Sequence, residues 1–294
     1  MKIKSVLESQ DSFNYDYLKK LEIKYKTPLI QLERGKVPPL NENTSDLFIT
    51  SQWEIKNILK IFRNRNRGHL CQFESGSFEQ EIYSSTLMIH QPDEFLIHPV
   101  QTILNHDKNN SAEILFQIQF ATMKEKNTLL EETTKALQKK NHTSTVVSQS
   151  LLIADELITN AILNGPKLYN IPDQYLENLE NNTPKTLDPS LKAEFILAQD
   201  ENRILILCRD DYGSLDVIRL MNRLYDCNKL GLSASMRMGT GGAGIGSYLI
   251  FNTGSSYYVG VKKGLKTVIG STLHWKWSHK KRSSEFKNIH IFQI

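Results

Sequence analysis

Glu156 and Asn160 lie four residues apart in the segment DELITNA, residues 155–161. Apolar residues at helical spacing predict that this segment is a helix with one buried face: Leu151, Ala154, Leu157, Ile158 and Ala161. Side chains four residues apart lie one turn above another on the same face of a helix. A carboxylate beside an amide oxygen suits a divalent cation and a water, and Glu156 could accept a proton from a nucleophile. An ordinary polar helix face is the alternative interpretation.

A second polar group ends the apolar run LILCRDDYG, residues 205–213. The run predicts a buried strand that ends in Asp211, with Gly213 two residues later. A carboxylate at a strand end, in a half-buried pocket, can accept hydrogen bonds from an exocyclic amine such as that of adenine. Glycine at this place would let the backbone approach a flat ring closely. A plain turn built from aspartate and glycine is the alternative.

Five glycines fall within the eight residues GTGGAGIG, 239–246, and the apolar run SYLIF follows directly. Glycines at a helix entrance leave backbone N–H groups free near the positive end of the helix dipole, which makes an anion site. They also permit the close approach of phosphate oxygens. The segment has neither the P-loop spacing nor the dinucleotide-binding spacing of glycines. A flexible surface loop is the alternative.

In their order along the chain, the three clusters resemble those of the Bergerat-fold ATPases. This GHKL superfamily contains gyrases, heat-shock chaperones, histidine kinases and mismatch-repair ATPases. The resemblance covers roughly residues 112–277: an E-x-x-x-N-A box at 156–161, a D-x-G box at 211–213, a lid at about 216–238 and a G-x-G-x-G box at 242–246. The short domain looks most like the anti-sigma-factor serine kinases and the catalytic domains of histidine kinases.

The resemblance implies that the chain binds ATP with Mg²⁺. Asn160 would hold the metal against the phosphates, and Glu156 would be the catalytic base that activates a water or hydroxyl. Asp211 would accept a hydrogen bond from the adenine amine, and Thr267 is the candidate for the family's late-strand threonine. The implied nucleotide-binding set is Asn160, Asn164, Asp211, Gly213, Gly242, Gly244, Gly246 and Thr267.

Two positions depart from the family pattern. Leu215 replaces the second glycine of the D-x-G-x-G box, and Asn164 stands near the place where many members carry a basic residue or histidine. Three interpretations therefore stay open: a protein kinase or nucleotide-gated binder of the anti-sigma-factor type, a non-catalytic adaptor, and an atypical histidine kinase. The last is disfavoured because Thr143, not an acid, follows His142 in a polar stretch that is predicted to be a loop.

The first third of the chain alternates short apolar runs with amphipathic stretches, which favours a parallel sheet flanked by helices. Strands are predicted at 3–7, 29–32, 47–50, 70–73 and 86–90, and helices at 15–24, 53–62, 78–83 and 95–104. Residues 1–106 loosely resemble a flavodoxin-like response-regulator receiver, with Gln91 before Pro92 where the family has lysine. No aspartate ends the third strand, so such a receiver would not be phosphorylated. An unrelated small α/β domain is the alternative.

The remaining residues, 107–294, are predicted to form a two-layer α+β Bergerat-fold domain with a mixed, largely antiparallel sheet. After a linker at 105–111, helices are expected at 112–140 and 145–163. Antiparallel hairpins are expected from 193–198 with 203–209 and from 255–261 with 266–275, where Gly264 supplies the turn. One more strand is predicted at 288–293.

Composition fits a globular protein, with 39% hydrophobic and 23% charged residues and a net charge of +4. The three cysteines, Cys71, Cys208 and Cys227, lack metal-ligand or disulfide-framework spacing. Neither a signal sequence nor an apolar run of ~18 residues is present, which predicts a cytoplasmic protein without a membrane partner. The basic run at 279–282 is expected to be a solvated turn, so nucleic acid is not expected to bind. The expected partner is a regulatory protein of a bacterial-type signalling pathway, and a homodimer stays open.

Overall fold

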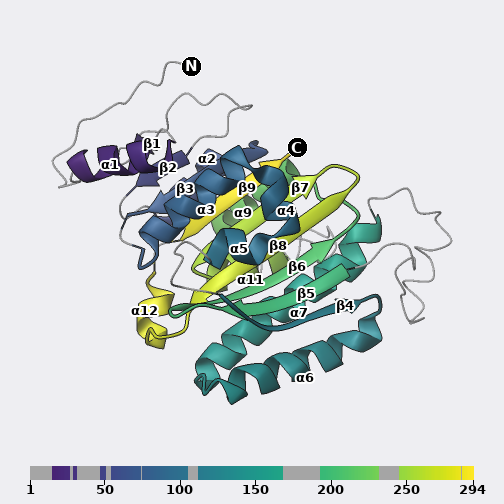
Figure 1. Ribbon diagram of the computed structural model, residues 1–294. Helices are drawn as coiled ribbons and strands as arrows, with labels where there is room; N and C mark the ends of the chain where they lie inside the picture. The colour runs from purple at the N-terminus through teal and green to yellow at the C-terminus, as the bar shows by residue number, and fades with distance from the viewer. Residues whose placement is uncertain are drawn as a thin grey trace.

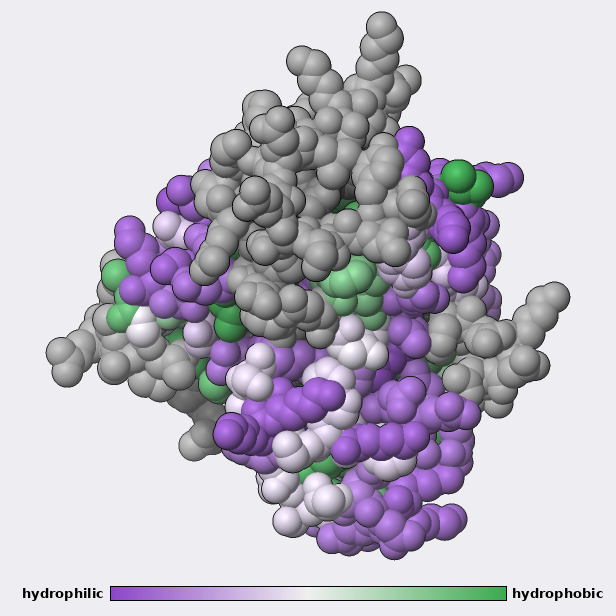
Figure 2. Space-filling view, turned by 90° about the vertical axis from the view of Figure 1, so that its left-hand side faces the viewer, coloured by the Kyte–Doolittle hydropathy of each residue, from purple (hydrophilic) through white to green (hydrophobic). Residues whose placement is uncertain are grey.

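The computed structural model describes residues 15–26, 29–31, 47–50, 54–73, 75–104, 112–167, 193–231, 245–285 and 287–294. Within these residues, nine strands form one mixed sheet in the order β1-β2-β3-β9-β7-β8-β6-β5-β4 (Figure 1). The fold is therefore α/β with an open mixed sheet. Figure 2 shows one side of the molecule, on which hydrophilic side chains predominate over the described residues and hydrophobic ones lie in small groups.

Two kinds of strand pairing make up this sheet. The first three strands are parallel to one another: β1 (Leu29–Gln31), β2 (Leu47–Thr50) and β3 (Arg67–Gln72). The last strand, β9 (Asn288–Gln293), lies antiparallel to β3 and parallel to β7. All other pairs are antiparallel and involve β4 (Glu113–Phe120), β5 (Ala193–Gln199), β6 (Arg203–Asp210), β7 (Ser256–Lys262) and β8 (Lys266–His274).

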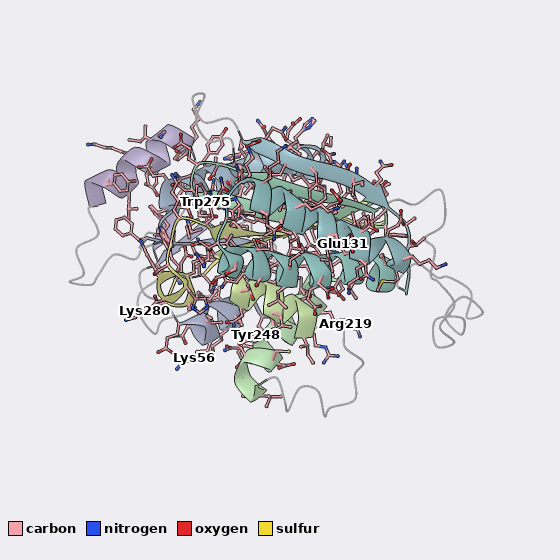
Figure 3. The ribbon with its side chains drawn as sticks, turned by 90° about the horizontal axis from the view of Figure 1, so that it is seen from below. Lys56, Glu131, Arg219, Tyr248, Trp275 and Lys280 are labelled. Carbon is pink, nitrogen blue, oxygen red and sulfur yellow. The ribbon has the colours of Figure 1, made fainter. Side chains whose placement is uncertain are left out.

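Helices cover both faces of the sheet. The layer that we call the α7 face contains α2 (Ile55–Phe62), α6 (Met123–Lys139), α7 (Ser144–Lys167), α9 (Val217–Leu230) and α11 (Ile245–Thr253). The opposite layer, the α3 face, contains α1 (Tyr15–Tyr25), α3 (Phe78–His90), α4 (Pro92–Ile97) and α5 (Pro99–Leu104). Figure 3 views the molecule from below, with Glu131 labelled on α6, Arg219 on α9 and Tyr248 on α11. None of the described helices has the length and hydrophobicity of a membrane span.

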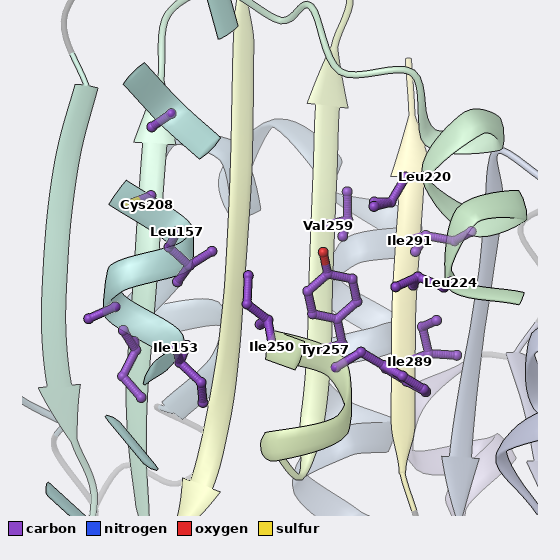
Figure 4. Close-up of a cluster of buried hydrophobic side chains, with 14 of the residues drawn as sticks. Ile153, Leu157, Cys208, Leu220, Leu224, Ile250, Tyr257, Val259, Ile289 and Ile291 are labelled. Carbon is purple, nitrogen blue, oxygen red and sulfur yellow. The ribbon is translucent and has the colours of Figure 1, made fainter. Parts of the chain in front are cut away.

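Strand alternation divides the core between these two faces. In β6, Ile206 and Cys208 pack toward the α7 face, while Leu205 and Leu207 pack toward the α3 face. Figure 4 shows the α7 side of this core, where Leu157 lies beside Cys208 and Ile250 of α11 lies beside Tyr257. Because side chains alternate between the two faces, these residues also show to which face each polar side chain farther along the same strand points.

A buried polar cluster around Glu81 holds α3 to the sheet. The fully buried Glu81 carboxylate accepts hydrogen bonds from Ser77 Oγ (3.0 Å), Ser256 Oγ (2.8 Å) and the Tyr258 hydroxyl (2.6 Å). His290 Nε2 lies 2.8 Å from Glu81 Oε2, and Arg203 Nη1 lies 3.5 Å from Oε1. Burial would raise the pKa of Glu81, but His290, Arg203 and Tyr258 lower it to about 2. The carboxylate is therefore held in its charged form.

Most elements expected from the sequence are confirmed. Strand 47–50, both C-terminal hairpins and the strand at 288–293 occur as expected, and Gly264 has φ +71° in its hairpin turn. The expected strand at 3–7 lies outside the described residues. The division into domains at residue 106 and their flavodoxin-like and Bergerat assignments stay predictions, and the sheet runs across that division.

Four expectations are wrong in part or whole. Residues 86–90 are not a strand, because they complete α3. Residues 112–140 are not one helix, because β4 precedes α6. Residues 95–104 divide between α4 and α5, with His98 between them. The basic run 279–282 belongs to the short helix α12 (His279–Ser283), where buried Arg282 donates to Gln149 Oε1 at 2.9 Å.

Candidate functional site

Helix α7 carries Glu156 and Asn160 as the sequence predicts. Its apolar stripe is buried against the sheet, with Ile153, Leu157 and Ile158 almost fully enclosed. Glu156 and Asn160 are half-buried, one turn apart on the adjoining side of the helix. The helix thus presents a carboxylate and an amide at the margin of the core.

Lys126 of α6 fixes the turn of α7 that carries these two side chains. Its Nζ lies 2.7 Å from Asp155 Oδ1 and donates to Thr159 Oγ1 at 2.9 Å. The Thr159 hydroxyl in turn donates to the backbone carbonyl of Asp155 at 2.7 Å. Because Asp155 and Thr159 directly precede Glu156 and Asn160, one lysine holds both functional candidates in register.

Glu156 lies against the first turn of α11, directly after the glycine-rich segment. A Cβ atom placed on Gly246 would lie 1.8 Å from Glu156 Oε2, so only glycine fits unless the carboxylate moves. Burial, together with Asp155, raises the pKa of Glu156, and Lys126 opposes this rise. The structure therefore brings together Glu156 and Gly246, the last glycine of the glycine-rich segment.

A buried polar pair lies at the end of β6. Asp210 and Thr267 face each other in the β6–β8 ladder and are only 8% and 2% exposed. The Tyr212 N–H donates to Asp210 Oδ1 at 3.0 Å. Burial raises the pKa of Asp210 to about 6, although the Tyr212 N–H and the Thr267 hydroxyl oppose the rise.

Strand parity puts Asp210 and Thr267 on the α7 face. Asp210 follows Cys208 by two residues in β6, and Thr267 precedes Ile269, which packs in the same core, by two residues in β8. Figure 4 shows Leu157 of α7 beside Cys208 of β6, and both belong to the core of the α7 face. The polar ends of α7, α11, β6 and β8 thus share one side of the sheet.

Asp211, which the sequence suggests as the adenine acceptor, occupies a different environment. Its side chain is 47% exposed, and its Oδ1 lies 3.3 Å from Lys266 Nζ. The buried acceptor at this strand end is its neighbour Asp210, which the sequence analysis did not select. The available signal was alternation, because Asp210 follows buried Ile206 and Cys208 at a spacing of two residues and so points to the same face of the strand.

Gly213 is required for a reason other than the expected approach to a flat ring. It has φ +56°, and a Cβ atom there would lie 2.1 Å from the carbonyl oxygen of Lys262. Its own carbonyl accepts the Gly264 N–H at 3.1 Å. Glycine at this position lets the chain that leaves β6 pack on the β7–β8 turn.

Other predicted site residues are described only in part. Gly242 and Gly244 lie outside the described residues, and Asn164 lies in α7 beyond the last described side chain of that helix. Much of the expected lid is the helix α9, which buries Leu220, Met221 and Leu224. No group of three or more His, Cys, Asp or Glu side chains that could hold a metal occurs among the described residues.

His142 lies in the turn between α6 and α7, as its polar surroundings indicate. Its Nε2 is 2.9 Å from Gln199 Oε1, and its ring contacts Trp275 edge-on with centroids 5.0 Å apart. These contacts give the imidazole a packing role at the end of β5. Its position in a turn differs from the helical phosphoacceptor expected of a sensor histidine kinase.

No protein-family model matches the chain, and no curated protein matches it.

Proposed function

We propose that this chain is a cytoplasmic ATP-binding signalling protein of the GHKL type. Like the anti-sigma-factor kinases that it resembles, it would phosphorylate a regulatory protein or bind it in a nucleotide-dependent way. The observation that carries the proposal is the pair Asp210 and Thr267, a buried carboxylate of raised pKa beside a buried hydroxyl, on the face that also carries Glu156 and Asn160.

The residues at the end of β6 fit an adenine base. A buried carboxylate and hydroxyl destabilise a fold unless hydrogen bonds compensate for the lost water. The exocyclic amine of adenine is a donor that Asp210 could accept, and the Thr267 hydroxyl can donate or accept. We assign the amine-binding role to Asp210 in place of Asp211, because Asp211 is half-exposed and paired with Lys266.

The phosphate side of the site would be built by α7 and α11. Bound ATP and Mg²⁺ would supply the transferable phosphoryl group and a counter-charge for the phosphates. The Asn160 side-chain oxygen would hold the metal, and the first turn of α11 would direct N–H groups toward phosphate oxygens. Glu156 would accept the proton of the attacking hydroxyl or water. Lys126, through Asp155 and Thr159, would keep both α7 side chains in place.

A non-catalytic adaptor is the second candidate, and Leu215 favours it. Leu215 replaces the second glycine of the D-x-G-x-G box and packs partly buried against the core of the α7 face. A packed side chain there reduces the freedom that a glycine would give. Such a protein would bind nucleotide or partner without turnover.

Calorimetric titration with Mg²⁺–ATP tests nucleotide binding. Asp210→Asn replaces an acceptor by a group that also donates, so we expect affinity to fall by about 1.5–3 kcal/mol, roughly 10- to 150-fold. Asp211→Asn is the matched control and should leave affinity near that of the wild type. If the wild type does not bind, or if the Asp211 variant alone loses affinity, this assignment of the base pocket is wrong.

Turnover separates the kinase from the adaptor. A positioned base contributes ~10²–10⁴-fold in rate, so Glu156→Ala should lose hydrolysis or phosphotransfer by that factor and keep its ATP affinity. Gly246→Ala should act in the same direction, because the new methyl group would displace the Glu156 carboxylate. Rate and affinity are measured in one preparation. A wild type that binds ATP but turns none over with any protein partner supports the adaptor.

A further inference from the structure

Strand β4 forms one edge of the sheet and has no strand partner on its outer side among the described residues. It spans Glu113–Phe120, and the side chains of Ile114 and Ile118 are each 42% exposed. Exposed edges are usually protected by lysine, proline or short length, because their free N–H and C=O groups can pair with another chain. This strand contains no lysine, proline or glycine, and its one irregularity lies between Ile114 and Phe116.

The unprotected part of β4 reads the same in both directions: FQIQF, residues 116–120. In an antiparallel pair of two copies centred on Ile118, Phe116 faces Phe120 and Gln117 faces Gln119. Ile118 faces its own copy. Alternation puts the aromatic and isoleucine pairs on the α7 side and the glutamine pairs on the other. Aromatic and glutamine cross-strand pairs both favour such a ladder.

Charge does not oppose this pairing. Glu113 is the only ionisable residue in β4, and its Oε1 lies 2.6 Å from Lys140 Nζ of the same chain. Its Oε2 also accepts a hydrogen bond from Gln199 at 3.2 Å. Residues 116–120 carry no charge of their own, and the nearest carboxylate, Glu194 of β5, accepts a hydrogen bond from Gln117 at 2.7 Å and is paired with Arg209. The like-charge contacts that separate many edge strands are therefore missing here.

We propose that two copies of this chain associate through β4, antiparallel about a two-fold axis at Ile118, and form one continuous sheet. The opposite edge of the described sheet is β1, which has only three residues. Because the two edges differ and the β4 pairing is isologous, association closes at two copies instead of continuing into a filament.

Sedimentation of the full chain tests whether β4 is a dimer interface. The wild type is expected to be a dimer, and Ile118→Lys, which brings two like charges together at the axis, a monomer. Ile218→Lys on α9, where the wild-type side chain is 39% exposed, is the matched control and should stay dimeric. Mixing the Ile118→Lys and Ile118→Glu variants should restore a dimer that contains one of each. A monomeric wild type, or a dimer that Ile118→Lys leaves intact, overturns the proposal.

A cysteine at the axis tests the register independently of any loss of stability. The native cysteines Cys71, Cys208 and Cys227 are buried. Ile118→Cys should form a disulfide-linked dimer on mild oxidation, since paired Cα atoms in a ladder lie within disulfide reach. Ile114→Cys is the control, because in this register Ile114 faces Thr122. Cross-linking at 114 and not at 118 would exclude the proposed axis.

Discussion

Each face of the sheet buries a carboxylate, and the two are held in opposite ways. Glu81 on the α3 side accepts hydrogen bonds from three hydroxyls and pairs with His290, and its pKa falls to about 2. On the α7 side, Asp210 accepts hydrogen bonds from the Tyr212 N–H, the Gly213 N–H and the Thr267 hydroxyl, but burial outweighs them and raises its pKa to about 6. At Glu81 the donors and the neighbouring Arg203 outweigh the cost of burial, so the carboxylate stabilises the fold. At Asp210 burial outweighs the donors, so a further donor from a ligand would be favourable.

Removing the satisfied carboxylate should have the largest effect. Glu81→Ala removes the buried carboxylate beside Arg203 and His290 and leaves three hydroxyls without an acceptor, while Arg203 keeps its ion pair with Asp200 at 2.8 Å. We expect a loss of about 3–5 kcal/mol in the free energy of unfolding, measured by urea denaturation. Glu131→Ala on the exposed side of α6 is the control and should change stability by less than about 0.5 kcal/mol. Equal effects of both substitutions would contradict the structural role of the cluster.

Acid should destabilise the protein through the same carboxylate, that of Glu81. The pKa of Glu81 is about 2 in the folded protein and 4.5 in the reference state, so its stabilisation is present above pH 4.5. It is lost as pH falls from 4.5 toward 2, by about 3 kcal/mol in all. Urea denaturation at several pH values should show a steeper acid loss in the wild type than in Glu81→Gln. Parallel curves for the two proteins would show that the folded-state pKa is not lowered.

Asp210→Asn should change the free energy of unfolding by a smaller amount and in the opposite direction, toward higher stability. The pKa of Asp210 is raised from 3.8 to about 6, so its contribution to stability is full below pH 3.8 and is lost as pH rises through 6. A neutral amide avoids this loss, and we expect the variant to gain on the order of 1–3 kcal/mol at pH 7. Thermal unfolding without nucleotide measures the gain. A variant less stable than the wild type would show that Asp210, like Glu81, stabilises the fold in its charged form.

The sequence allows the positions of the two C-terminal hairpins and of α7 to be predicted, because their apolar periods are long and bounded by turn residues. Residues 86–90 mislead because Glu81 and Ser85, which lie on the buried side of α3, are polar and conceal its helical period. The start of α6 does have a local signal. Glu125 Oε2 accepts the Thr122 N–H at 2.8 Å, as the T-x-x-E spacing predicts, and residues 116–120 before it alternate between apolar and polar.

The candidate site could be predicted in its residue types but not in its buried acceptor. The spacing of Glu156 and Asn160 follows from helix geometry, and the contact of Glu156 with Gly246 agrees with the order of the motifs. The choice between Asp210 and Asp211 depends on where β6 ends and on its register with β8. The cross-strand contacts that settle the register, such as that between Asp210 and Thr267, join segments far apart in the chain. No local pattern reveals them.

The position of β9 has a consequence for biosynthesis. Strands β1–β3 join the remaining strands only through β9, which begins at Asn288, whereas β3 ends at Gln72. During translation, the edge of β3 that pairs with β9 therefore stays unpaired until nearly all the residues between the two strands have been synthesised and have left the ribosome. A nascent chain in that interval exposes an open strand edge, which is the kind of surface that chaperones shield from aggregation. Translation speed before residue 288 thus becomes a determinant of yield for this topology.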